Sequence, residues 1–265
     1  MFVSLTRWLE RLSLDAVMVA LLWGLALEEV SRRQLRMGDI LVLSLATWLT
    51  YVADRLRDAG SDRETPQTDR HLFHERNRKP ISLIWLALFA LSFLIAVILL
   101  PVWKLLWGWV LVMAIVAYLW VLGQRLSSSR RLLLKRIAVP LIFTAGVCWM
   151  TESWRTREGI LASLVLLAGA LANVLLISYQ ENRDKGYPPW LPRALGGSLF
   201  GLLLLGNGFL LLHWPFGVAA LYGAAVYFIL LLQVKARGVE WIRLWVDATL
   251  ADMAILILVL EYFFF

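Results

Sequence analysis

The chain has 265 residues, of which 60% are hydrophobic, with 26 lysines and arginines against 19 aspartates and glutamates. Soluble domains are about 45–50% apolar, so this chain has too few polar groups to cover a water-facing surface. The composition excludes an ordinary soluble protein and indicates a protein of the lipid bilayer. Basic loops beside membrane spans account for the net charge of +7, so we expect no nucleic-acid partner.

Nine apolar segments follow one another along the chain, and each is continuous rather than alternating. Such runs favour helices over a β-barrel, because a helix needs about 20 apolar residues to cross the hydrocarbon core. The sequence therefore predicts an all-α, polytopic membrane protein in which residues 1–265 form one transmembrane domain, a single bundle of nine helices. The segments cover residues 14–30, 40–53, 81–100, 105–122, 137–150, 160–177, 194–212, 216–234 and 244–265.

The distribution of basic residues sets the predicted orientation. If the N-terminus is cytoplasmic, 20 of the 26 lysines and arginines fall in the N-terminal segment and in the loops after the even-numbered segments. Because cytoplasmic loops are enriched in Lys and Arg, this bias predicts a cytoplasmic N-terminus and an odd number of spans. The basic residues left on the opposite side are Arg32, Arg33, Arg36, Lys104, Arg155 and Arg157.

One cytoplasmic loop, at 54–80, is longer than two neighbouring helices need. Long loops in compact proteins are commonly functional. The stretch Thr68-Asp69-Arg70-His71 is typical of a helix start. We expect this loop to form a structured cap on the cytoplasmic side.

The first acidic motif closes the second apolar segment. Asp54 and Asp58 are four residues apart, so in a helix they are neighbours on one face, with Tyr51 and Thr47 further inside on the same face. Two carboxylates one turn apart repel each other unless a cation lies between them, and carboxylate oxygens are ligands that Mg²⁺ prefers. We expect Asp54 and Asp58 to bind Mg²⁺, with Thr47 and Tyr51 lining the pocket. The alternative is an ordinary solvated helix end.

The second acidic motif closes the sixth apolar segment. Glu181 and Asp184 are three residues apart and share a helix face, on which Asn173 lies two turns further inside and lines the pocket. Both motifs fall at the cytoplasmic ends of even-numbered segments and hence at one membrane depth. We expect their four carboxylates to form one Mg²⁺ and diphosphate site that faces the cytoplasm.

Basic residues at the start of the fifth segment complete the predicted site. Arginine binds phosphate oxygens in a bidentate manner and lysine acts as a point charge. We expect Lys135 and Arg136 to contact the diphosphate, and Arg55 is a similar candidate. The alternative is that they only flank the membrane.

In these motifs the chain resembles the UbiA superfamily of intramembrane prenyltransferases. The family's first motif, Asn-Asp-x-x-Asp-Arg-x-x-Asp, is matched by Thr-Tyr-Val-Ala-Asp-Arg-Leu-Arg-Asp at 50–58, followed by Lys-Pro-Ile at 79–81. Its second motif, Gln-Asp-x-x-Asp-Arg-Lys-Gly, in which the arginine is optional, is matched by Gln-Glu-Asn-Arg-Asp-Lys-Gly at 180–186. A third element, Leu-Lys-Arg at the start of the fifth helix, is matched at 134–136.

The resemblance implies a nine-helix membrane enzyme. Its Mg²⁺ ions, held by Asp54, Asp58, Glu181 and Asp184 as the catalytic residues, would help an isoprenyl diphosphate to ionise. The prenyl group would then pass to a lipophilic acceptor.

Two departures from the family pattern bear on the acceptor. Glu181 replaces an aspartate and keeps the ligand chemistry, whereas Tyr51 replaces an aspartate and removes a charge. The Tyr51 change favours a divergent acceptor or none, so the alternative function is a terpene cyclase that cyclises the prenyl diphosphate itself. A further alternative, from another class, is a non-catalytic scaffold or transporter, which predicts no dependence on the acidic motifs.

The last apolar segment carries two carboxylates, Asp247 and Asp252. Carboxylates inside a membrane span are costly, and by default they indicate a functional site. For Asp247 an ion pair with Arg243, four residues earlier, is the plainer alternative. The sequence assigns no role to either carboxylate.

Overall fold

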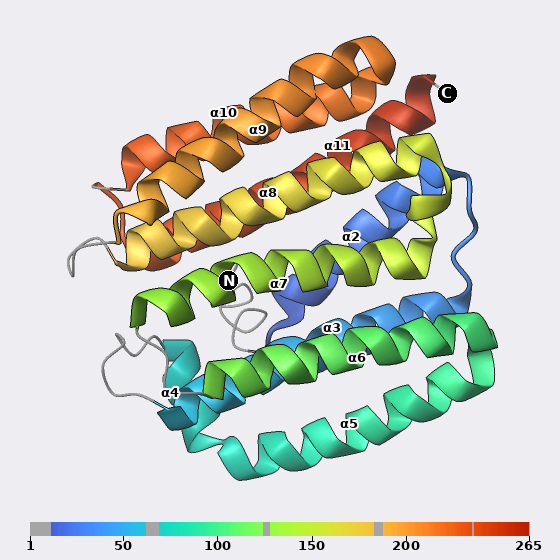
Figure 1. The fold of residues 1–265 in the computed structure, drawn as a ribbon, viewed down its shortest axis with the longest axis vertical. Coiled ribbons are helices and arrows are strands. Elements are labelled where there is room, and N and C mark those ends of the chain that lie inside the picture. The colour runs from blue at the N-terminus through green and yellow to red at the C-terminus, as the bar shows by residue number, and fades with distance from the viewer. Residues whose placement is uncertain (1–11, 62–68, 124–127, 183–187, 235, 265) are drawn as a thin grey trace, which may run out of the picture. The chain divides into compact units, whose positions relative to one another are not determined.

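The computed structural model describes residues 12–61, 69–123, 128–182, 188–234 and 236–264. Within these ranges every regular element is a helix, and nine helices have 18 residues or more (Figure 1). This confirms the all-α prediction. The long helices are α2 (Leu14–Ser31), α3 (Met37–Ser61), α5 (Arg78–Leu99), α6 (Val102–Gly123), α7 (Ser128–Thr151), α8 (Arg157–Glu181), α9 (Trp190–Leu212), α10 (Trp214–Gln233) and α11 (Val239–Phe264), and the short ones are α4 (Asp69–Arg76) and η1 (Ser153–Arg155).

Seven of the long helices, α3 and α5 to α10, are long and apolar enough to cross a membrane. The other two, α2 and α11, are of comparable length but each contains three or more charged residues. The described part of the chain is thus compatible with a polytopic helical membrane protein, as the composition predicts. The number of spans stays a prediction.

The chain divides into two compact units. Unit 1 comprises residues 1–21 and 36–119, and unit 2 comprises residues 22–35 and 120–265. Unit 1 therefore holds α3, α4, α5 and most of α6, whereas unit 2 holds α7 to α11. The prediction of one bundle around one site stays a prediction.

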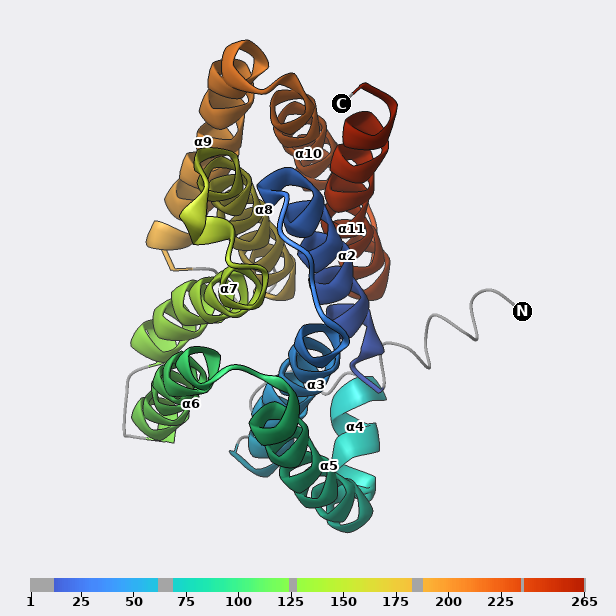
Figure 2. The ribbon, with the colours of Figure 1, turned by 90° about the vertical axis from the view of Figure 1, so that its right-hand side faces the viewer.

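In unit 1, α3 packs against α5, and the short α4 contacts both of them (Figure 2). The indole N–H of Trp85 donates to the carbonyl of Leu49 at 2.8 Å and joins α5 to α3. Trp48 donates to the carbonyl of Leu12, also at 2.8 Å. Such bonds suit an apolar solvent, because a polar ring N–H in lipid needs a partner inside the protein.

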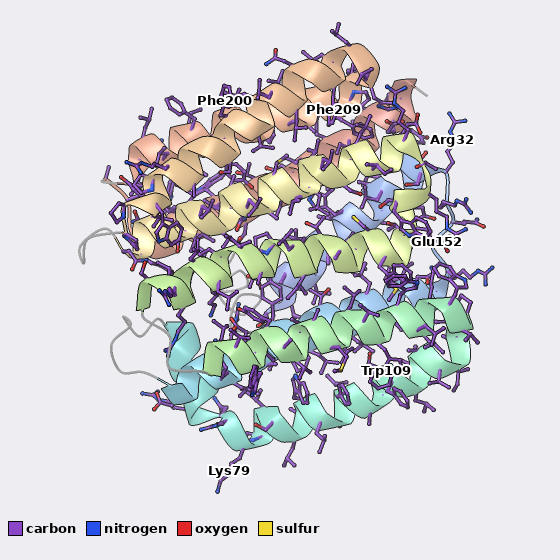
Figure 3. All side chains as sticks on the ribbon, viewed as in Figure 1. Arg32, Lys79, Trp109, Glu152, Phe200 and Phe209 are labelled. Atoms are coloured by element: carbon purple, nitrogen blue, oxygen red, sulfur yellow. The ribbon has the colours of Figure 1, made fainter. Side chains whose placement is uncertain are left out.

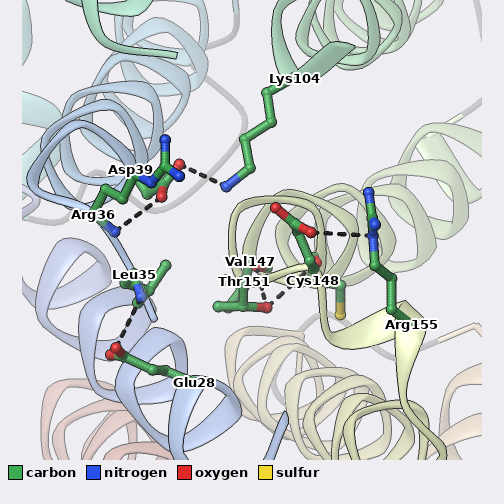
Figure 4. A network of polar contacts seen from close by, with 10 residues as sticks. Glu28, Leu35, Arg36, Asp39, Lys104, Val147, Cys148, Thr151 and Arg155 are labelled. Carbon is green, nitrogen blue, oxygen red and sulfur yellow. Dashed lines mark hydrogen bonds and ion pairs between the residues drawn. The ribbon is translucent and has the colours of Figure 1, made fainter. Parts of the chain in front are cut away.

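A buried ion pair joins the first turns of α3 and α6. The Lys104 Nζ lies 2.7 Å from Asp39 Oδ1, and the two side chains are only 6% and 3% exposed (Figure 4). The other oxygen, Asp39 Oδ2, accepts a hydrogen bond from the Arg36 backbone N–H at 3.0 Å. The carboxylate is therefore compensated by one charge and one main-chain donor.

In unit 2, α8 is the central helix, because it contacts α7, α9, α10 and α11. Glycines allow close approach between α9 and α10 and between α10 and α11. A Cβ on Gly206 of α9 would meet Leu221 of α10 at 2.7 Å, and one on Gly223 of α10 would collide with Met253 of α11. The two faces of α9 differ in exposure. Phe200 is 61% exposed whereas Phe209 is 5% exposed. Both residues are labelled in Figure 3.

Local signals place several helix ends. The Thr156 side chain caps α8 by accepting from the Gly159 N–H at 3.1 Å. His213 alone connects α9 to α10, so these two helices form a tight hairpin. The α4 helix begins at Asp69, where the sequence of the predicted cap loop indicates a helix start.

Lys104→Met is expected to destabilise the protein by about 3–5 kcal/mol, because it leaves the Asp39 carboxylate buried without its cation. The double variant Asp39→Leu/Lys104→Met should recover most of this loss, since no charge then remains buried. Thermal unfolding in detergent measures both effects.

The matched control is Arg155→Gln. The ion pair of Arg155 with Glu152, at 3.1 Å, is more exposed, with side chains 37% and 18% accessible. Losing it should cost about 0–1 kcal/mol. Equal losses for Lys104→Met and Arg155→Gln, or no recovery in the double variant, would contradict a structural role for the buried pair.

Candidate functional site

The first acidic motif lies on one continuous helix. Because α3 extends to Ser61, Thr47, Tyr51, Asp54 and Asp58 share the helical row that the sequence predicts. Thr47 is buried. Asp54 Oδ1 accepts from Arg57 Nη2 at 3.3 Å, and the Asp54 side chain is 21% exposed. The carboxylate is thus half-buried near the end of the helix.

Two further residues of the first motif, Asp58 and Arg55, lie beside Asp54 on α3. Asp58 belongs to α3, but its side chain is outside the described ones. Arg55 is half-buried, one position after Asp54. Of the predicted site residues Asp54, Arg55 and Asp58, the structure therefore describes one carboxylate, that of Asp54, and the neighbouring guanidinium group of Arg55.

The second acidic motif carries a three-helix ion-pair cluster in unit 2. Glu181 is the last residue of α8, and its Oε2 accepts from Arg136 Nη2 of α7 at 2.8 Å. Its other oxygen, Oε1, accepts from Arg243 Nη2 of α11. One carboxylate therefore holds two guanidinium groups and balances only one of them. We call Arg136, Glu181 and Arg243 the arginine clasp.

The arginine clasp has an unused hydrogen-bond donor and an excess of positive charge, both of which favour anion binding. The Arg136 Nε is buried and has no hydrogen-bond partner among the described residues. The Arg243 side chain is 8% exposed, so its charge lies in a poorly hydrated place. A positive charge with an unused buried donor attracts anions, and phosphate oxygens match guanidinium groups well.

A buried glutamine fixes the geometry beside the clasp. Gln180 is 4% exposed, and its amide donates to the carbonyl of Arg237 at 3.0 Å. This bond ties the end of α8 to the turn that precedes α11. The clasp is therefore supported from the chain segment that leads to Arg243.

Two turns inside the clasp, Asn173 contacts α11. Its amide donates to Asp247 Oδ1 at 3.0 Å and to the carbonyl of Val246 at 3.1 Å. Asn173 is predicted as a pocket residue, and in the structure its partner is the carboxylate to which the sequence assigns no role. The other carboxylate of α11, Asp252, accepts from the Tyr222 hydroxyl at 3.2 Å.

Arg243 is the residue that sequence reasoning missed as part of the site. Its spacing suggests an ion pair with Asp247, whereas the structure shows it bound to Glu181. The available signal was a basic residue at the predicted cytoplasmic start of an apolar segment, and such a residue is also typical of any membrane flank. Lys135 lies on α7 beside Arg136, and its contact with a diphosphate stays a prediction.

The predicted metal ligands fall into separate groups. Asp54 belongs to unit 1 and Glu181 to unit 2, while Asp184 lies outside the described residues. Across the described ranges, no three His, Cys, Asp or Glu side chains come together to hold a metal ion. Convergence of the four carboxylates on one Mg²⁺ site stays a prediction.

The opposite end of unit 2 carries a histidine outside the site. His213 Nδ1 lies 3.4 Å from Glu261 Oε1. Burial lowers the pKa of the His213 imidazole, and the carboxylate of Glu158 acts in the other direction. This pair lies at the α9–α10 connection, whereas Glu181 lies at the other end of α8.

Comparisons with family models, curated proteins and solved structures found no match for this chain. The resemblance to the UbiA superfamily therefore rests on the motifs alone.

Glu181→Gln is expected to lower the free energy of unfolding by about 3–5 kcal/mol, because it leaves the buried Arg243 without its carboxylate. Asp54→Asn should cost about 0–1 kcal/mol, since the Arg57 pair is more exposed and within one helix. Thermal unfolding of both variants in detergent provides the measurement. A Glu181 variant as stable as Asp54→Asn would mean that the clasp contributes nothing to the fold.

Proposed function

We propose that this chain is a divergent, UbiA-like enzyme of nine membrane spans that acts on an isoprenyl diphosphate from the cytoplasmic side. In the preferred reaction the prenyl group passes to a lipophilic acceptor. The proposal combines the motif resemblance with the charge bias of the loops and the helical, apolar fold.

The observation that carries the proposal is the arginine clasp. A diphosphate leaving group needs cationic donors that are in place before the reaction, since fixed donors cost no reorganisation when charge develops. Glu181 holds Arg136 and Arg243 together from three helices while neutralising only one of them. That arrangement supports diphosphate binding better than it supports an ordinary solvated helix end.

The predicted metal ligands Asp54 and Glu181 differ in how well they suit Mg²⁺. Asp54 is a half-buried carboxylate of the kind that Mg²⁺ takes together with phosphate oxygens and water. Both oxygens of Glu181 accept from arginines, so Glu181 suits the role of positioning Arg136 and Arg243. We propose Asp54 as the Mg²⁺ ligand of the described chain, with Asp58 and Asp184 as the further ligands that the sequence predicts.

Bound Mg²⁺ would neutralise charge on the diphosphate. The remaining roles in the reaction belong to the chain's own residues. Arg136 and Arg243 bind and orient the diphosphate, Lys135 and Arg55 add positive charge, and the apolar helices keep water from the prenyl chain. Exclusion of water matters because it preserves a reactive allylic cation for its intended nucleophile.

The direct test incubates the purified full-length protein with Mg²⁺ and C10, C15 or C20 prenyl diphosphates, with and without a lipid extract from the producing cells. Turnover that needs the extract indicates a transferase. A cyclic hydrocarbon formed without the extract indicates the cyclase. If no prenyl diphosphate releases pyrophosphate in either condition, the enzyme proposal is wrong and the scaffold or transporter alternative gains.

Asp54→Asn is expected to reduce pyrophosphate release by roughly 100-fold or more, because it removes a charge that holds the metal and diphosphate. Tyr51→Phe, one turn away, is the comparison and should lose far less activity than Asp54→Asn. A loss of about 10-fold would indicate that the Tyr51 hydroxyl donates to developing charge. Steady-state rates at saturating Mg²⁺ give the comparison. Wild-type turnover by Asp54→Asn would exclude metal-assisted ionisation at this motif.

The proposed topology places Glu75 in the cytoplasm and Arg157 on the opposite side, and both side chains are exposed. Single cysteines introduced at these positions, in a Cys148→Ala background, should react with an impermeant thiol reagent only from their own side. The first should be labelled in inside-out vesicles and the second in intact cells. The reverse pattern, or labelling of both from one side, would contradict the nine-span orientation.

A further inference from the structure

One carboxylate of α11, that of Asp252, lies on the exposed face of the helix. By helical spacing Asp252 shares its face with Ile255 and Val259, each 43% exposed, whereas Leu250 and Ala254 on the opposite face are 6% and 0% exposed. Asp252 itself is half-buried. Its carboxylate is therefore at the surface of unit 2 and not in the core of that unit.

The neighbouring helix α10 continues this exposed surface. It packs against α11, and its Phe228 and Ile229 are 55% and 51% exposed (Figure 2). The Tyr222 hydroxyl of α10 donates to Asp252 Oδ2 at 3.2 Å and so bridges the two helices. We call the surface around this bond the Asp252 face. It comprises Tyr222, Phe228, Ile229, Asp252, Ile255 and Val259, and all of its members except the hydrogen-bonded pair are apolar.

The hydrogen-bonded pair lies near the middle of both helices. Asp252 is thirteen residues from the start of α11 and twelve from its end, which corresponds to about 18–20 Å from either end. Tyr222 is eight residues from the start of α10 and eleven from its end. Because α10 is long and apolar enough to cross a membrane, the predicted topology puts the pair near mid-membrane depth.

The Asp252 carboxylate at this depth calls for a positively charged partner. Charged side chains inside a span are costly, and they commonly pair with a group of opposite charge. The Tyr222 hydroxyl is a neutral donor, so it orients the carboxylate but does not balance its charge. In the part of the chain that the structure describes, no lysine or arginine pairs with Asp252.

The sequence and the bilayer restrict where such a cation can come from. None of the nine predicted apolar segments contains a lysine or an arginine. A second copy of this chain would therefore bring another carboxylate to the Asp252 face and no cation at its depth. Amino groups of lipids stay at the headgroup level, outside the hydrocarbon core. A cation at mid-membrane depth therefore comes from a side chain of another membrane protein.

We propose that the Asp252 face binds a transmembrane helix of another protein, whose lysine or arginine pairs with Asp252 at mid-membrane depth. Tyr222 holds Oδ2 of the carboxylate, which leaves Oδ1 for the cation. The apolar side chains on both sides of the pair provide the packing surface, since helices in lipid associate through close contacts and polar bonds. This inference goes beyond the proposed function and does not depend on it.

The test uses the purified full-length protein in phosphatidylcholine vesicles and synthetic polyleucine helices of about 22 residues, long enough to span the bilayer. One helix has a lysine at its centre. The others have a leucine there, an asparagine there, or the lysine moved about 10 Å toward one end. Energy transfer from a fluorophore on the N-terminus of the protein to an acceptor on the helix gives the affinity in each case.

We expect wild type to bind the central-lysine helix about 10-fold more tightly than the leucine helix, the scale of a polar contact between helices in lipid. Asp252→Asn should remove this preference, and Asp252→Glu should retain it. The matched control is Asp247→Asn, which removes the same chemical group from α11 at the position bound by Asn173. This control should keep the preference.

The outcomes that overturn the inference are distinct. Equal binding of the leucine and central-lysine helices means that the Asp252 face recognises no cation. Equally tight binding of the asparagine helix means that a protonated Asp252 pairs with any polar group. A preference that Asp252→Asn keeps, or that Asp247→Asn loses equally, means that Asp252 is not the partner. Should Asp252→Asn fail to fold, as judged by its melting temperature, wild type decides: binding of the displaced-lysine helix as tight as that of the central-lysine helix overturns the inference.

Discussion

The carboxylate of Glu181 is the point at which unit 2 concentrates its charge. Arg136 comes from α7, Glu181 from α8 and Arg243 from α11, so three helices depend on one carboxylate for the position of their ends. Two guanidinium groups this close would repel each other without it. With it, they form a partly buried, positively charged cluster, which is a costly arrangement unless an anion binds there.

The helices that surround this cluster follow from the sequence, but the cluster itself does not. Apolar length predicts the helices, and the hairpin at His213 and the start of α4 at Asp69 agree with local signals. Pairing between Arg243 and Glu181 joins residues 62 positions apart. Helical periodicity relates residues within one helix only. It therefore suggested Asp247 as the partner of Arg243, and it contains no information on which helices pack together.

The same limit applies to Asn173. Helical spacing correctly puts Asn173 on the stripe of Glu181, since both are on α8. The partner of Asn173 is on α11, and only the packing of α8 against α11 brings the two together. Polar groups in apolar helices are easy to find in a sequence, whereas their partners depend on rotation and depth.

The single-residue connection between α9 and α10 has a consequence for how the protein is made. A loop this short prevents the two helices from inserting far apart, so they should leave the translocon as one helical hairpin. Gly206 and Gly217 let their backbones touch, with a Cβ on Gly217 only 2.8 Å from the Gly206 carbonyl oxygen. Because helix pairs in lipid associate through such close contacts rather than through exclusion of water, the hairpin can pack before α11 has been synthesised. When α11 follows, it brings Arg243 to the Glu181 carboxylate and so completes the charge cluster.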